Sequence, residues 1–175
     1  TKAVPDSGAP LEARLRVLWK AITTNSPPDA VPAFFSRTAY IQVKNLKPRA
    51  AGADFDRRLM GQFLSDVATF HRAIGPGVET AEFVSVNAQP DFARWIRPRA
   101  CHNRLGYWHE PGVRIVYRLN GKLYSIRVTS LISWRGEWYV VHLGNHAVPR
   151  DTHRYLDVFT GRTEGEGVPG PPGGC

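Results

Sequence analysis

The chain has 175 residues, of which 42% are hydrophobic and 11% aromatic, so it can form one domain with a real core and is not a wholly disordered chain. Lys and Arg outnumber Asp and Glu by 23 to 15, and the formal net charge of +8 favours anionic ligands or surfaces. The basic residues are scattered, which argues against nucleic-acid binding, and no apolar run is long enough for a membrane span.

Helices are expected in the first part of the chain. Residues 1–9 are small and polar and predict a flexible lead-in, after which apolar residues spaced by three and four predict an amphipathic helix from Pro10. A second, short helix is predicted over 29–35, where an aspartate can cap its start. Residues 38–44 favour a short strand, and the polar stretch that follows, through Gly52, predicts a loop.

The strongest helical pattern starts at Asp54. Glycine can end such a helix in the left-handed conformation and proline cannot continue it, so Gly75-Pro76-Gly77 marks its end. The apolar side chains that recur every three or four residues between these points are Phe55, Leu59, Phe63, Val67, Phe70 and Ile74.

Beyond Gly77 the apolar residues alternate, which is typical of strands. Residues 78–88 are rich in β-forming residues. Asn120-Gly121 predicts a type I′ turn, and Arg135-Gly136 predicts a second tight turn. Three of the expected strands therefore form an antiparallel meander, with the helix from Asp54 as its cover. These strands are 113–119, 122–134 and 137–143.

Together these patterns predict one α+β domain over residues 10–145, in which N-terminal helices pack on a curved, mostly antiparallel sheet. Residues 146–175 form a Gly- and Pro-rich extension that is expected to be disordered from about residue 161. Cys101 lies inside the domain and Cys175 ends the extension, so either a disulfide or two separate thiols fits the sequence. The first residue is Thr1 and no charged-then-apolar leader follows, which leaves a cytoplasmic and an exported protein both open.

The order of the predicted elements, helices first and then long strands joined by tight hairpins, resembles the nuclear-transport-factor-2-like superfamily, whose fold is a cystatin-like cone. The stretches Gly106-Tyr107-Trp108-His109 and 130–144 are also similar to those of uncharacterised actinobacterial proteins of this superfamily. The resemblance implies a pocket between the curved sheet and the long helix. It also implies a range of functions, since the superfamily includes dehydratases, isomerases and cyclases, ligand-binding proteins and dimerising adaptors.

Two polar residues on the apolar face of the predicted long helix are the candidates for catalysis. On a projection of about 100° per residue, Asp66 and His71 lie within the apolar arc from Phe55 to Leu64. An acid and an imidazole on a buried face need partners, and a general acid/base pair is one role for them. In the alternative, structural role, Asp66 pairs with an arginine from another element and His71 hydrogen-bonds a backbone carbonyl.

Four further residues are candidates for ligand binding. Tyr107 and His109 come just before Pro111-Gly112, where a turn would place them either at the mouth of a pocket or at a corner of the sheet. Trp138 and His142 share one face of the last predicted strand. Both faces of that strand are largely apolar, so alternation does not decide which of them is buried.

The sequence has no Gly-rich phosphate loop, no nucleophile elbow and no histidine spacing typical of a metal site, so we expect neither a metal nor a cofactor. Our leading hypothesis is a non-enzymatic domain that binds a small, partly apolar and anionic molecule, or a protein partner. The alternative is a small lyase or isomerase with His71 as general base and Asp66 or Tyr107 as its partner. An exposed apolar sheet face would also support a homodimer.

Overall fold

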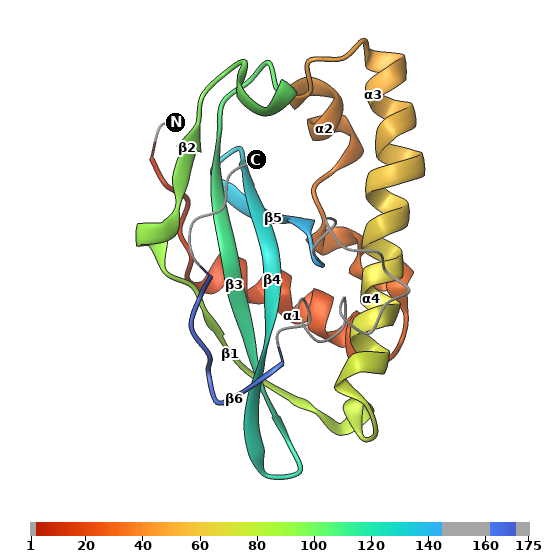
Figure 1. Ribbon diagram of the computed structural model, residues 1–175, viewed down its shortest axis with the longest axis vertical. Helices are drawn as coiled ribbons and strands as arrows, with labels where there is room; N and C mark the ends of the chain where they lie inside the picture. Colours follow the sequence, from red (N-terminus) through yellow and green to blue (C-terminus); the bar gives the residue numbers. More distant parts are fainter. Residues whose placement is uncertain (1–2, 145–161, 171–175) are drawn as a thin grey trace.

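The computed structural model describes residues 3–144 and 162–170, with helices first and an antiparallel sheet after them (Figure 1), which confirms the predicted α+β class. Its main helices are α1 (Ala9–Thr23), the 3-10 helix η1 (Pro27–Ala33), α2 (Arg37–Val43), α3 (Pro48–Asp54), the π-helical turn η2 (Phe55–Leu59) and α4 (Met60–Ile74). Its strands are β1 (Glu82–Asn87), β2 (Arg94–Ile96), β3 (Tyr107–Leu119), β4 (Lys122–Trp134), β5 (Glu137–His142) and β6 (Thr163–Glu164).

Helix α1 confirms the amphipathic helix predicted from Pro10. It buries its apolar face, which includes Leu11 and Trp19. The ring of Trp19 lies 4.7 Å from that of Tyr117 in β3, and its indole N–H donates a hydrogen bond to the carbonyl of Ala81. The start of the domain is therefore joined to the sheet by packing and by a buried hydrogen bond.

The prediction of a strand over 38–44 and of a loop after it is wrong, because both stretches contain helices. The first is α2, whose start is capped by Ser36: its side-chain oxygen accepts a hydrogen bond from the N–H of Ala39 at 3.2 Å. Helix α2 buries Tyr40 and Val43 on one face. Burial of this face outweighs the β propensity of its branched residues, and α3 follows with a proline in its first turn, where proline is tolerated.

The long helix predicted from Asp54 is confirmed, and it starts earlier than predicted, because α3, η2 and α4 follow one another without a break. In Figure 1 these three elements form one column beside the hairpin of β3 and β4. Gly75 ends the column with a φ of +86°, which L side chains rarely adopt. Phe63 of α4 stacks on Phe34, with ring centroids 4.1 Å apart.

The sheet is open, with strand order β1-β3-β4-β5; β2 also pairs with β3, and β6 pairs with β4. The long hairpin of β3 and β4 forms its centre. Asn120 and Gly121 make the turn, with φ values of +51° and +76°, as a type I′ turn requires. The predicted meander from β3 to β5, with its second tight turn at Arg135-Gly136, is confirmed.

Strand β3 runs through Pro111-Gly112, where the sequence predicts a turn. Pro111 lies opposite Ser130 of β4, and the register is unchanged on either side. Gly112 takes a φ of +68°, and its carbonyl accepts a hydrogen bond from the N–H of Gly170. The β3–β4 pairing before and after Pro111-Gly112 therefore keeps this dipeptide in the strand, although it is a common turn signal.

Strand β5 contains a bulge at Val141. Its pairing with β4 steps from Val140 directly to His142, while β4 advances by one residue from Leu131 to Ser130. Alternate residues of a regular strand point to opposite faces, so the extra residue moves His142 to the face opposite that of Trp138. The predicted shared face of Trp138 and His142 is therefore wrong.

The segment 162–170 lies along the sheet, although the sequence predicts disorder there. β6 pairs with β4, and Arg162 donates a hydrogen bond to the carbonyl of Ile74 at 2.8 Å. Gly167 leaves no room for a side chain, because a β-carbon there would lie 2.2 Å from Nε of the buried Arg114. Gly167 and Gly170 thus allow close contact with the sheet.

One continuous hydrophobic core joins the helices to the sheet. No helix within 3–144 or 162–170 is long and apolar enough to cross a membrane. Cys101 is disulfide-bonded. The predicted domain end at residue 145, most of the extension 146–175 and Cys175 lie outside the described residues.

Candidate functional site

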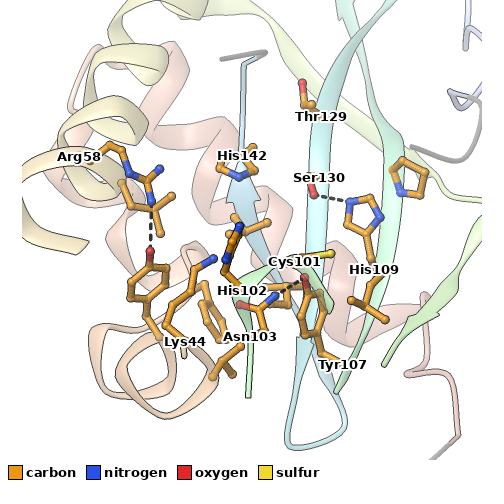
Figure 2. A pocket seen from close by; sticks show the side chains of 18 of the residues that line it. Lys44, Arg58, Cys101, His102, Asn103, Tyr107, His109, Thr129, Ser130 and His142 are labelled. Atoms are coloured by element: carbon orange, nitrogen blue, oxygen red, sulfur yellow. Dashed lines mark hydrogen bonds between the residues drawn. The ribbon is translucent and has the colours of Figure 1, made fainter. Parts of the chain in front are cut away.

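A cavity of about 550 Å³ lies between the helices and the sheet, and its volume is within the range typical of small-molecule sites. Its walls come from α2, the turn η2 of the long helix, the loop 99–103 and strands β3 to β5 (Figure 2). The larger apolar side chains of the lining are Phe35, Val43, Leu59, Ile96, Pro111, Ile132 and Val141. The polar ones are Tyr40, Lys44, Arg58, His102, Asn103, Tyr107, His109, Arg127, Thr129, Ser130 and His142.

The helical wall carries two cations, Lys44 and Arg58. Arg58 pairs with Asp54, one turn earlier in the long helix, at 2.7 Å, and also donates to the hydroxyl of Tyr40 at 3.1 Å. The hydrogen bond from Arg58, assisted by one from Tyr40, lowers the pKa of Asp54 to about 2. Burial and the charge of Arg58 lower the pKa of Lys44 below its ordinary value. Lys44 therefore lies in surroundings that disfavour its charge.

The loop 99–103 connects the helical wall to the sheet wall. Arg99, Cys101 and His102 have φ values of +73°, +55° and +56°, which are uncommon for residues with side chains. The guanidinium of Arg104 donates to backbone carbonyls at the end of α2, which fixes the loop to the helices. As a result, His102 and Asn103 lie in the lining of the cavity.

The sheet wall carries two hydrogen-bonded pairs (Figure 2). The side-chain amide of Asn103 donates to the hydroxyl of Tyr107 at 3.0 Å, and Nε2 of His109 lies 2.5 Å from the hydroxyl oxygen of Ser130. Burial raises the pKa of Tyr107 and lowers the pKa of His109. At neutral pH the phenol therefore keeps its proton and the imidazole is uncharged. Tyr107 and His109, two of the predicted ligand-binding residues, both line the cavity.

The other two predicted ligand-binding residues lie in different places. His142 lines the cavity, on the face that the bulge gives it, opposite Ser130. Trp138 is buried in the core, and its indole N–H donates to the carbonyl of Pro5 at 3.2 Å. Trp138 is outside the cavity lining, so the structure brings only three of the four residues together.

Asp66 and His71, the predicted catalytic residues, do not line the cavity. Asp66 is fully buried, and its carboxylate accepts a hydrogen bond from the N–H of Gly144 at 3.0 Å. Nδ1 of His71 lies 2.8 Å from the carbonyl oxygen of Ile22 and must carry the proton that it donates. His71 thus has the backbone partner of the structural alternative, whereas the partner described for Asp66 is a backbone N–H and not an arginine.

Sequence reasoning does not single out Lys44, Arg58 or Ser130 as site residues. Lys44 is missed because 38–44 is interpreted as a strand; as the C-cap of helix α2 it lies beside the long helix. Arg58 looks like one of several arginines on a solvated helix face, and its pairing with Tyr40 depends on α2 being helical. For Ser130, no local pattern distinguishes it from the other hydroxyl residues of β4.

The lining is electropositive. Lys44, Arg58 and Arg127 contribute cationic side chains, and no Asp or Glu is among the described residues that line the cavity. Within 3–144 and 162–170 there is no group of His, Cys, Asp and Glu that could hold a metal ion. The chemistry that this arrangement suits is the binding of an anion beside an apolar surface.

No family model matches the chain, and neither the curated proteins nor the solved structures contain a significant match.

Proposed function

We propose that this protein binds a small, partly apolar organic anion in the cavity of a nuclear-transport-factor-2-like cone. The observation that carries the proposal is the charge of the lining, which includes Lys44, Arg58 and Arg127 and, among the described residues, no carboxylate. The lowered pKa of Lys44 supports it, because burial beside another cation disfavours the charged ammonium. An anion in the cavity would compensate that charge.

The apolar half of the lining supports a hydrocarbon body for the ligand. Phe35 and Leu59 come from the helical side, and Ile132 and Val141 come from the sheet. Ligands in such cavities gain most of their affinity from burial of apolar surface, while a few polar groups fix their orientation. An aromatic acid combines both features.

Isothermal titration calorimetry with a matched set of probes tests this proposal. The anionic probes are naphthalene-2-carboxylate, naphthalene-2-sulfonate and 2-naphthyl phosphate, and the neutral probe of similar shape is naphthalene-2-carboxamide. We expect at least one anion to bind about 10-fold more tightly than the carboxamide, because charge-assisted hydrogen bonds are the stronger ones. The same anion should raise the melting temperature with increasing concentration, since it binds only the folded state.

The variants Lys44→Met and Lys122→Met separate the cavity from the overall charge. Lys122 is exposed at the far end of the β3–β4 hairpin, so both changes remove one positive charge but only the first alters the lining. Lys44→Met should lower the affinity for the anion and leave the affinity for the carboxamide unchanged. Lys122→Met should change neither affinity. Equal affinity for charged and neutral probes, or no binding of any anion, would contradict the proposal.

The enzymatic alternative depends on Asp66 and His71. Neither of these residues lines the cavity, and each hydrogen-bonds a backbone group, so the alternative has no support there. A protein partner and a homodimer stay predictions. Sedimentation velocity of the purified protein measures the dimer directly.

A further inference from the structure

The hydroxyl groups of Tyr107 and Ser130 are the two hydroxyls on the sheet wall that have a described hydrogen-bond partner. Tyr107 accepts a hydrogen bond from the amide of Asn103, and Ser130 lies 2.5 Å from Nε2 of His109. A hydroxyl group that accepts a hydrogen bond still has its own proton to donate. Among the described residues, no group accepts a hydrogen bond from Tyr107. Whether the hydroxyl of Ser130 donates or accepts the hydrogen bond with His109 depends on which ring nitrogen carries the proton.

The ring proton of His109 belongs on Nε2. Burial lowers the pKa of His109, so the neutral ring carries one proton at neutral pH. Nδ1 is buried and has no hydrogen-bond partner among the described residues. A proton on Nδ1 would leave a buried N–H unsatisfied, whereas a proton on Nε2 is donated to Ser130. His109 is therefore the donor, and the O–H of Ser130 is left to point elsewhere.

The same reasoning applies to Tyr107. Asn103 is 3% exposed, and its N–H donates to the phenolic oxygen. Burial raises the pKa of Tyr107, so the phenol keeps its proton at neutral pH. One lone pair of the oxygen is occupied by Asn103, and the O–H is available in the cavity that Tyr107 lines.

We propose that Tyr107 and Ser130 are the specificity-determining residues of the cavity, and that their O–H groups donate to the oxygens of an oxyanion. Asn103 and His109 are positioning residues that each donate to one hydroxyl oxygen and so orient its O–H group towards the ligand. The proposal rests on the proposed function and adds to it the part of the ligand that is recognised. The group bound at the sheet wall is a carboxylate, sulfonate or phosphate, which has acceptors only.

This arrangement also selects against neutral ligands. The other polar side chains of the lining include Lys44, Arg58 and Arg127, which donate hydrogen bonds and accept none. A carboxamide of the same shape presents an NH2 group to the oxygens of Tyr107 and Ser130, each of which already accepts one hydrogen bond. At these two hydroxyl groups its N–H groups would meet weaker acceptors than water, which costs affinity.

The test uses calorimetry with naphthalene-2-carboxylate, naphthalene-2-sulfonate, 2-naphthyl phosphate and naphthalene-2-carboxamide on the full chain and on variants. Tyr107→Phe and Ser130→Ala should each lower the affinity for the most tightly bound anion by about 10-fold or more. This is the effect expected for one hydrogen bond to a charged group. Each should change carboxamide affinity by much less. Tyr139→Phe and Ser85→Ala, which lie outside the cavity lining, are the matched controls and should leave every probe unchanged.

Asn103→Leu tests the positioning role. It frees the oxygen of Tyr107 to accept from an N–H, so carboxamide affinity should rise while that of the anion falls. If Asn103 had only a structural role, its replacement would lower the affinity for both probes together.

Nitrogen-15 NMR of the histidine ring gives a second measurement that needs no substitution. We expect the proton of His109 on Nε2. A proton on Nδ1 would make Ser130 the donor to the imidazole and would overturn the proposal, as would unchanged anion affinity in both Tyr107→Phe and Ser130→Ala. If the unaltered protein prefers an anion and these two variants keep that preference, the proposed function stands and only the present inference falls. If the unaltered protein shows no preference, both fall.

Discussion

Asp66, in the middle of α4, accepts a hydrogen bond from the backbone N–H of Gly144, just past the end of β5. The carboxylate is fully buried, and Gly144 itself lines the cavity. This contact joins the long helix to the end of the last long strand. A residue predicted for catalysis therefore holds two walls of the cavity together.

Replacement of Asp66 should destabilise the fold. Asp66→Ala removes a buried acceptor and leaves the N–H of Gly144 without it, so we expect the free energy of unfolding to fall by about 1–3 kcal/mol. Urea denaturation measures the change. Asp56→Ala is the control, because Asp56 forms an exposed salt bridge with Arg37 and such pairs contribute little. Equal losses in the two variants would contradict the role assigned to Asp66.

The acid sensitivity of the protein should depend on Asp54. Its pKa is about 2 in the folded protein, whereas an unperturbed aspartate has a pKa of about 3.9. The folded state thus gains stability from the carboxylate above about pH 4 and loses it as the pH falls towards 2. In urea denaturation at a series of pH values, Asp54→Asn should show a flatter decline over this range. Parallel pH profiles of the two proteins would refute the prediction.

Two glycines of the segment 162–170 provide a matched test of its contact with the sheet. Gly165 and Gly167 have φ values of +79° and +63°, so alanine at either position costs roughly 1–2 kcal/mol for its backbone conformation. Only at Gly167 would the β-carbon also meet another group, Nε of Arg114 at 2.2 Å. Gly167→Ala should therefore destabilise more and speed tryptic cleavage after Arg162. Equal effects would show that the contact with Arg114 contributes nothing.

Filling of the cavity should change the protonation of Lys44. Its pKa is lowered by burial and by the charge of Arg58, and an anion nearby favours the charged ammonium. Saturation with the tightest naphthalene anion should therefore raise the pKa of Lys44, with uptake of protons when the pH lies near that pKa. NMR titration of the ¹³C-methylated lysines follows this shift, and Lys44→Arg assigns the signal. An unchanged pKa in the saturated protein would place the anion away from the helical wall.

The parts of the fold that follow from the sequence are those with one dominant local signal. The long helix combines a sustained apolar period with a glycine stop at Gly75, and the β3–β4 hairpin has a turn at Asn120-Gly121 whose backbone requirement few other residues meet. Helix α2 has no such signal. Its branched residues favour a strand, and the cap at Ser36 and the burial of one face make it helical.

The candidate site is predicted less well from the sequence, because it depends on which residues from distant parts of the chain come into contact. Tyr107 and His109 are found from their aromatic and imidazole groups near a strand end, and they do line the cavity. Asp66 and His71 satisfy the same reasoning, yet neither lines the cavity, and each hydrogen-bonds a backbone group. Buried polar residues on a helix face show that a partner is required; they do not show whether the partner is a ligand or a peptide group.

The bulge at Val141 shifts the phase of β5, so that Val141 and His142, adjacent in the chain, both line the cavity. One residue adds hydrocarbon surface and the next an imidazole, which a regular strand would send to opposite sides. An alignment of this chain with a relative that lacks the bulge would need a one-residue gap in β5. Without that gap, His142 would be matched to the core-facing positions that follow Trp138 and Val140.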